Sequence, residues 1–338
     1  MLFKKSISFT DIHLGLKNNS VQHNQDCFAY AQWLISMAKK NDCETCFFLG
    51  DWHHHRSSIN LNTMHYTSKI LQLLNDNFEQ VFMLVGNHDL YYRESREVHG
   101  LRFTELYPNI TLIEKPVQLG DVMLIPWLVK DEWKEFEGIT SKYVFGHLEL
   151  PTFKLNQMIE MPDHGQLNSK HFSKTEYVFS GHFHKRQVQG NIHYIGNPFP
   201  HNYSDAWDDD RGAMLLEYDG EPRYINWEGM PKYRTISLDD LLVDPSSILE
   251  DNMHVRVSMD SAISHEDLNY IKETLAHSFN LRELHITSSA SREGLDGGSL
   301  VNNDLVFESI DQIVTKQLLN IQSKAYDQDI LVAIYNSV

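Results

Sequence analysis

The chain is poor in cysteine and has no hydrophobic run long enough to cross a bilayer. Its three cysteines, Cys27, Cys43 and Cys46, are too few for a disulfide framework, which predicts a reducing compartment. The apolar runs are strand-sized, far short of the ~20 residues that a membrane helix needs. The apolar part of the N-terminal stretch is too short for a signal peptide. We therefore expect a cytoplasmic protein without a membrane anchor.

Basic residues are also scarce. The sequence has 29 Lys and Arg against 46 Asp and Glu, which gives a formal net charge of −17. This balance argues against a protein that holds nucleic acid on a broad basic face. It does not exclude a phosphate-binding protein, because metal ions or a basic partner subunit can supply the positive charge. Histidine is abundant, with 19 residues, and its distribution along the chain is informative.

The first 85 residues alternate between short apolar runs and amphipathic stretches. Strands are predicted at 5–10, 45–49 and 81–85, and helices at 24–40 and 61–77. This order is a βαβαβ unit, so the sheet should be largely parallel. Further strand-like runs end near residues 126, 145, 180, 195 and 218. The β-rich pattern after residue 146 predicts a second sheet packed against the first.

The composition changes near residues 231–241. An alternating strand at 253–259, a helix with Leu268, Ile271 and Leu275 on one face, and a returning strand near 284–286 predict a small separate β-α-β domain. A Ser- and Gly-rich linker at 288–299 follows. The chain then continues with an amphipathic helix at 308–322 and an apolar segment at 330–335.

Polar side chains follow five of the strand-like runs. The carboxyl ends of parallel strands meet at one edge of a sheet, where open α/β sheets form their sites. Seven of these side chains are suitable metal ligands: Asp11, His13, Asp51, Asn87, His147, His182 and His184. Each short motif alone is common as a turn. Their joint occurrence, each after an apolar run, predicts a metal centre.

The donor types indicate the metal and the chemistry. Mixed carboxylate, amide and imidazole donors suit Mn²⁺, Fe²⁺ or Zn²⁺ better than Mg²⁺ or Ca²⁺. Seven ligands are too many for one tetrahedral ion, so two ions sharing one carboxylate are expected. Such a pair activates a bridging water and stabilises the charge of a phosphoester transition state. His88 is placed to assist the leaving oxygen, and we expect Asp89 to accept a hydrogen bond from its ring and fix the tautomer.

These motifs resemble the blocks of the calcineurin-like metallophosphoesterase superfamily. The blocks are Asp11-Ile12-His13, Gly50-Asp51, Gly86-Asn87-His88-Asp89, Gly146-His147 and Gly181-His182-Phe183-His184. The resemblance implies an α/β fold, a two-sheet α/β/β/α sandwich with a C-terminal β-α-β capping domain and a helical tail.

Within the superfamily the chain looks most like the SbcD/Mre-type DNA repair nucleases. His54 and Arg56-Ser57-Ser58 follow Gly50-Asp51, and Tyr194-Ile195-Gly196-Asn197-Pro198 follows the last histidine block. The run Gly146-His147-Leu148-Glu149-Leu150 and the chain length are most similar to the small nuclease subunits of T-even-type phages. A phage-encoded protein of this kind would act in the host cytoplasm.

The resemblance implies a role for each site residue. One ion takes Asp11, His13, Asp51 and His184, and the other takes Asp51, Asn87, His147 and His182. His88 is then the catalytic histidine, and His54 matches a non-ligand position near the substrate. Because His53, His54 and His55 are adjacent, which of them faces the site stays open, and a solvated histidine run is the alternative.

The resemblance also implies an organisation and partners. We expect a nuclease domain at 1–235, a DNA-capping domain at 236–290, and a linker and helix at 300–338 that bind an SbcC-like ABC-type coiled-coil ATPase. Packing of this helix on its own chain is the alternative. A homodimer through nuclease-domain helices is expected, with 61–77 as the candidate. The implied activity is Mn²⁺-dependent double-strand exonuclease and single-strand endonuclease, with Mg²⁺, Fe²⁺ or Zn²⁺ as alternative ions. The rival functions are a metallophosphatase and a non-catalytic DNA-end-binding subunit.

Overall fold

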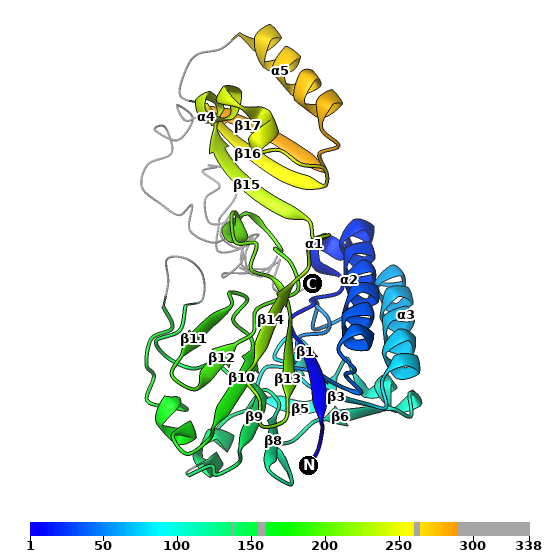
Figure 1. Ribbon diagram of the computed structural model, residues 1–338, viewed down its shortest axis with the longest axis vertical. Coiled ribbons are helices and arrows are strands. Elements are labelled where there is room, and N and C mark those ends of the chain that lie inside the picture. Colours follow the sequence, from blue (N-terminus) through cyan, green and yellow to red (C-terminus); the bar gives the residue numbers. More distant parts are fainter. Residues whose placement is uncertain (137, 155–159, 260–263, 289–338) are drawn as a thin grey trace, which may run out of the picture. The chain divides into compact units, whose positions relative to one another are not determined.

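The computed structural model is a mixed α/β protein with two six-stranded sheets and a smaller three-stranded sheet (Figure 1). It describes residues 1–136, 138–154, 160–259 and 264–288. Nearly all of the expected linker, the helix at 308–322 and the apolar segment at 330–335 lie outside the described residues. Among the described residues, no helix combines the length and the apolar character needed to span a bilayer.

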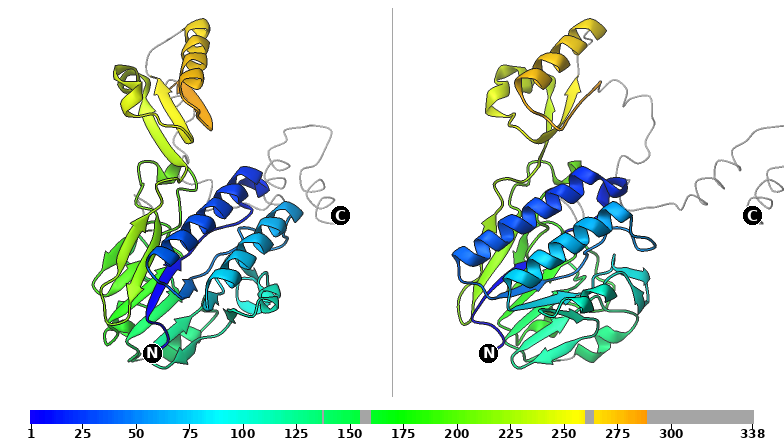
Figure 2. Two further views of the ribbon diagram at one scale, coloured as in Figure 1. Left: turned by 45° about the vertical axis from the view of Figure 1, so that its right-hand side comes forward. Right: turned by 90° about the vertical axis from the view of Figure 1, so that its right-hand side faces the viewer.

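The first sheet has the strand order β14-β13-β1-β2-β3-β6, and β1, β2, β3 and β6 run parallel. The strands are β1 Lys5–Phe9, β2 Thr45–Phe48, β3 Gln80–Leu84, β6 Ile110–Ile113, β13 Gly212–Glu217 and β14 Arg223–Asn226. The connecting helices, α2 Val21–Lys40 and α3 Leu61–Asn77, lie side by side on one face of this sheet (Figures 1 and 2). The predicted βαβαβ unit is confirmed. Helix α2 begins three residues earlier than predicted, because the Ser20 side chain caps it by accepting from the His23 N–H.

The second sheet has the order β11-β12-β10-β9-β8-β7. Its strands are β7 Val117–Leu119, β8 Val122–Ile125, β9 Tyr143–His147, β10 Tyr177–Gly181, β11 Gln187–Gln189 and β12 Ile192–Tyr194. In chain order, the short turn α1 Leu16–Asn19 follows β1, and the hairpin of β4 Leu90–Tyr92 and β5 Ser95–His99 lies between β3 and β6. Strands β8, β9, β10 and β12 are parallel, so their carboxyl ends meet at one edge.

Alternation along the strands explains how the layers pack. On β2, Cys46 and Phe48 face the helices, and Phe47 faces the second sheet. The Phe47 ring stacks on the Phe145 ring of β9 with 4.0 Å between centroids. Two apolar layers therefore hold the helices and the two sheets together.

The outermost layer differs from the expected α/β/β/α order. In the described residues, the outer face of the second sheet is covered by loops and 3-10 turns at Glu132–Phe136 and Ser169–Phe172. The segment after β9 contains Pro151, Pro162 and Gly165, which oppose a continuous helix. Buried rings such as Phe172 supply the cover that a helix was expected to provide.

The third sheet has the order β15-β16-β17, with β15 Lys232–Ser237, β16 Met253–Met259 and β17 Glu283–Ser288. Helix α4 Leu238–Val243 follows β15, and α5 His265–Ser278 joins β16 to β17. The predicted β-α-β unit is present. Strand β15 extends it by pairing in parallel with β16. This sheet has an apolar core of its own, built around Leu241, Val255, Val257 and Leu275.

Candidate metal centre

The carboxyl ends of β1, β2, β3, β9 and β10 bring all seven predicted ligand side chains together. Beyond their ends, β1 and β2 stay linked: the Asp11 N–H donates to Gly50 O at 2.9 Å and the His13 N–H to Asp51 O at 3.2 Å. The His182 N–H of the β10 loop donates to Asp11 Oδ2 at 3.0 Å. The loops of both sheets thus converge on one point.

Asp11, His13 and His184 form what we call the first half of the centre. His13 Nε2 lies 3.2 Å from His184 Nε2 and 3.9 Å from Asp11 Oδ1. Two ligand atoms on one ion, each ~2.1 Å from it at tetrahedral or smaller angles, are ~3.0–3.4 Å apart. The closest spacing in this half therefore matches that of atoms sharing one cation.

Asn87, His147 and His182 form the second half. His147 Nε2 lies 2.9 Å from Asn87 Oδ1, and His182 Nδ1 lies 3.1 Å from the same oxygen. Asp51 stands between the halves. Its Oδ2 is 3.5 Å from His13 Nε2, and its Oδ1 is 3.5 Å from His147 Nε2. One carboxylate therefore offers one oxygen to each half.

Hydrogen bonds at the far side of each ring fix the tautomers. His147 Nδ1 donates to the Leu49 carbonyl at 2.7 Å, so Nε2 is the ring nitrogen that faces the second half. His182 Nε2 lies 3.2 Å from Glu149 Oε1, so Nδ1 is the atom of that ring that faces the second half. Once His147 has lost its Nε2 proton, the atoms that converge on the centre are lone-pair donors, and a cation is the partner that such a set fits. Buried Asp and His groups of this kind are consistent with a dinuclear metal site.

Four of the convergent residues adopt the left-handed backbone conformation. The φ angles are 52° for Asp11, 46° for His13, 62° for Asp51 and 87° for His182. This conformation is unfavourable for residues with a Cβ and persists only where the surroundings enforce it. Such strain is concentrated at functional sites, and here it turns the side chains at the strand ends toward the centre.

Two glycines let the loops approach one another. A Cβ on Gly86 would lie 2.2 Å from Asp51 Oδ1, and a Cβ on Gly50 would lie 2.4 Å from His147 Nδ1. Gly50 also has a φ of 106°, which favours glycine. Any side chain at these positions would displace the bridging carboxylate or the His147 ring.

Asp89 does not contact the His88 ring, and that expectation is wrong. Its carboxylate accepts the N–H groups of Asp51 (3.1 Å), Trp52 (3.0 Å), His53 (3.1 Å) and Gly86 (2.9 Å). Burial and the neighbouring Asp51 charge raise the pKa of Asp89 to about 7, and the backbone donors oppose this rise. Asp89 therefore holds the loop after β2 against the turn after β3.

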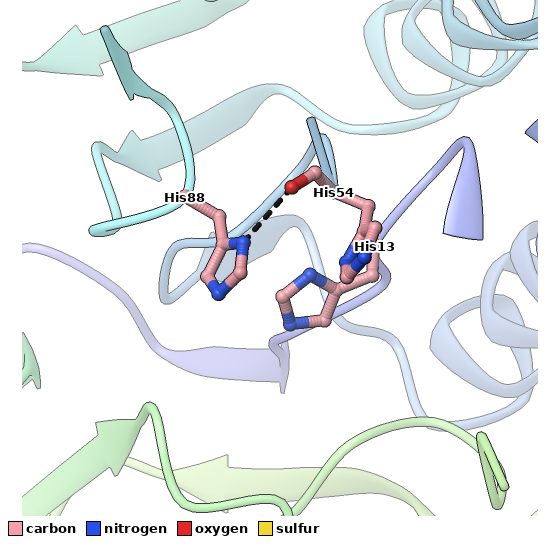
Figure 3. Close-up of side chains that lie close together, drawn as sticks. All are labelled: His13, His54 and His88. Carbon is pink, nitrogen blue, oxygen red and sulfur yellow. Dashed lines mark hydrogen bonds between the residues drawn. The ribbon is translucent and has the colours of Figure 1, made fainter. Parts of the chain in front are cut away.

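The partner of His88 is instead the His54 carbonyl, to which His88 Nδ1 donates at 2.9 Å (Figure 3). The His54 ring stacks on the His88 ring with 5.4 Å between centroids and lies 5.5 Å from the His13 ring. His53 is buried and bonds through Nε2 to Thr67 Oγ1 of α3 at 2.9 Å. Of the histidine run, His54 faces the centre and His53 faces away.

Charge and burial make the two halves unlike. Burial lowers the pKa of His13 well below its usual value, so its ring is neutral at pH 7. Burial opposes protonation of His147 too, but the Asp51 charge outweighs it and raises the pKa of His147 to about 9. For Asp51, burial favours the neutral acid, yet the charges of His147 and His88 hold its pKa well below the usual range.

Three supporting residues were not predicted. Glu149 backs His182, and the Trp127 ring lies 5.0 Å from the His182 ring. The buried guanidinium of Arg211 donates to the His184 carbonyl at 2.5 Å and pairs with Asp208 at 2.9 Å. Glu149 lies two residues from His147, so its motif offered a signal. Arg211 offered none, because its contact depends on how β13 returns beside β1.

The chain is similar to one known protein family and to two known nucleases. The family model of calcineurin-like phosphoesterases matches residues 6–225. Exonuclease subunit 1 of Enterobacteria phage T4 is 29% identical over 228 residues, which cover 64% of this chain and 66% of that protein. The chain thus spans just under two thirds of this relative. The crystal structure of nuclease MPE from Pseudomonas putida matches 56% of this chain and 66% of its own, at 19% identity and a TM-score of 0.30. The family match covers more than half of the sequence, so the chain belongs to the calcineurin-like phosphoesterases.

Proposed function

We propose that this protein is a dinuclear-metal DNA nuclease that hydrolyses phosphodiester bonds in double-strand-break processing and recombination. The observation that carries the proposal is the placement of Asp51, which offers one carboxylate oxygen to each half of the centre. The His88 ring lies with its centroid 4.8 Å from that of His13, and its Nδ1 is committed to the His54 carbonyl, which leaves Nε2 as its remaining nitrogen. The similarity to a phage exonuclease subunit supports DNA as the substrate.

In this proposal the two ions are Mn²⁺, with Mg²⁺, Fe²⁺ or Zn²⁺ as alternatives. Asp11, His13 and His184 hold one, Asn87, His147 and His182 hold the other, and Asp51 is shared. When bound, the ions supply an activated water and bind the phosphate oxygens. His88 would direct its Nε2 at the leaving oxygen, which needs a proton or a hydrogen bond from that position. The His54 carbonyl orients that ring, and Asp89 keeps the two loops in register.

The organisation of the chain fits an acidic nuclease that works with partners. Residues 1–235 form the nuclease domain, and residues 236–290 form a capping domain that contributes to the grip on DNA. Residues 300–338 bind an SbcC-like ABC-type ATPase, which supplies basic surface that a chain of charge −17 lacks. Helix α3 is the proposed contact of a homodimer, by analogy with the resembling family.

Turnover of defined substrates tests the proposal. The purified chain is incubated with Mn²⁺, with and without the ATPase partner, on linear duplex DNA, single-stranded DNA and a phosphoprotein. Degradation of DNA is expected. Hydrolysis of the phosphoprotein alone would establish the rival metallophosphatase function instead.

A second comparison separates an enzyme from a non-catalytic DNA-end-binding subunit. His88→Ala is compared with His164→Ala, a histidine exposed on a loop of the nuclease domain. The enzyme proposal expects His88→Ala to lose ~10²–10⁴-fold in DNA turnover and His164→Ala to match the unmodified chain. Equal behaviour of the two variants would favour the binding subunit.

A further inference from the structure

The hairpin of β4 and β5 begins at the residue after Asp89 and carries two exposed aromatic rings. Tyr91 is 48% exposed and Tyr92 is 54% exposed, and their rings meet edge to face with 4.8 Å between centroids. The next residue, Arg93, is also exposed. Only two residues therefore separate the proposed catalytic histidine, His88, from a pair of aromatic side chains open to solvent.

The other strand of this hairpin fixes it to the body of the protein. Arg96 of β5 donates to the Trp127 carbonyl at 2.5 Å and pairs with Glu132. His99, at the end of β5, bonds to Glu114 at 2.6 Å. These contacts hold the hairpin in place, so Tyr91 and Tyr92 are presented to solvent in a fixed position.

Arg93 directly follows these rings in the chain, and Arg56 directly follows the histidine run 53–55. Within the described residues neither Arg56 nor Arg93 forms an ion pair, although Glu94 is the next residue in the chain. Burial and then the positive charge of Arg93 lower the pKa of Arg56, and the charges of Asp51 and Asp89 oppose this. Arg56 itself follows His54 by two residues. Because no ion pair occupies either guanidinium among the described residues, each can contact an anion.

We propose that Tyr91, Tyr92, Arg93 and Arg56 form a platform that binds a single-stranded segment of the nucleic acid beside the catalytic centre. This inference rests on the proposed nuclease function and names how its substrate is held. Unstacked bases rest on the tyrosine rings, and the two guanidinium groups contact backbone phosphates. A single strand is the occupant because aromatic stacking needs a base face that a paired duplex does not expose. The platform is insensitive to base sequence, since every base has such a face.

Binding of a short oligonucleotide tests the aromatic part. The full-length protein is titrated with fluorescent single-stranded DNA and with duplex DNA, and DNA turnover is normalised to that of a small aryl phosphodiester. Tyr91→Ala with Tyr92→Ala is expected to weaken single-strand affinity by ~10- to 100-fold and to lower the normalised turnover. The double Phe variant, which keeps both rings, should retain binding. The control is Leu106→Ala, a strongly exposed apolar side chain of the 3-10 turn Arg102–Leu106.

Salt dependence tests the cationic part. Arg93→Ala is expected to reduce the slope of log affinity against log salt by ~0.7, the amount for one phosphate contact on a single strand. Arg93→Lys should keep the slope, and Arg223→Ala, exposed on β14, serves as the control.

The outcomes separate this inference from the nuclease proposal. If the unmodified chain cleaves DNA and the double Ala variant binds and cleaves single strands equally well, the platform is overturned and the nuclease function stands. If the double Ala variant instead loses only the ATPase partner, the surface is a protein contact and the inference is overturned too. If the unmodified chain turns over only the aryl diester, the nuclease function fails and the platform fails with it.

Discussion

The two halves of the metal centre share Asp51 but differ in charge and in protonation. Besides one histidine each, His184 and His182, the first half adds the carboxylate of Asp11 and a neutral His13. The second half adds the amide of Asn87 and His147, whose pKa is raised to about 9. A cation entering the first half meets two carboxylates and displaces no proton from His13. A cation entering the second half meets one carboxylate and must displace a proton from His147. We therefore expect the two proposed ions to bind in order, with the first half filled before the second.

Removal of the shared carboxylate should have the largest effect, because it abolishes the distinction between the halves. Asp51→Asn removes one charged oxygen from each half, so the metal content should fall from about two ions per chain to below about one, and DNA turnover should vanish. Metal analysis after gel filtration, with circular dichroism to check folding, measures this. Two ions retained by Asp51→Asn would show that Asp51 does not bridge.

Loss of one half should leave the other. Asn87→Ala removes a ligand of the second half alone, so the metal content should fall from about two ions per chain to about one. DNA turnover should fall as if the second ion were absent. Asp11→Asn is the matched change in the first half. Because that half carries more negative charge, its loss should weaken the tighter of two binding steps in a Mn²⁺ titration. Identical titrations for the two variants would contradict the proposed order.

The pH dependence of metal binding sharpens the same contrast. The raised pKa means that His147 holds its proton in the metal-free protein up to about pH 9. Below that pH, the affinity of the second half should fall about tenfold per pH unit, because each ion competes with one proton. The first half should change little between pH 7 and 9, because His13 is already neutral. Calorimetry in buffers of different ionisation enthalpy counts the protons released when each ion binds. If binding of the second ion released no proton, this account would be contradicted.

The support of His182 should give the smallest effect. Glu149→Gln keeps the size of the side chain but weakens its bond to His182 Nε2. Carboxylates behind ligating histidines typically contribute ~10-fold or more in metal affinity, so a loss near that value is expected in the second half only. The control is Glu160→Gln, because the Glu160 side chain is exposed. A loss in both halves would mean that Glu149 acts on the whole loop.

The convergence of the seven side chains could be predicted from the sequence because chain order encodes it. Parallel strands such as β1, β2 and β3 end at one edge, so residues that follow them must meet. The contacts of Asp89 could not be read in the same way. Its partners are backbone N–H groups of residues 51–53, and their approach depends on the glycine at position 86, not on any residue type beside Asp89.

The fold, too, was predicted from the sequence only where the pattern of apolar residues is regular. The long periodic helix α3 was predicted to the residue, and α2 was predicted correctly except for its first three residues, because tertiary packing reinforces their apolar spacing. The short strands β4 and β5 carry exposed side chains and no alternation, so the hairpin beside His88 gave no signal. The cover of the second sheet was expected to be helical, but its proline-containing segment packs through single buried rings instead.

The most direct test of the central claim is DNA turnover by His88→Ala measured together with its Mn²⁺ content. We predict about two ions per chain, as in the unmodified protein, with turnover reduced ~10²–10⁴-fold, because His88 acts on the leaving oxygen and does not hold an ion. A variant that loses metal in proportion to its activity, or that degrades DNA as fast as the unmodified chain, would contradict the account.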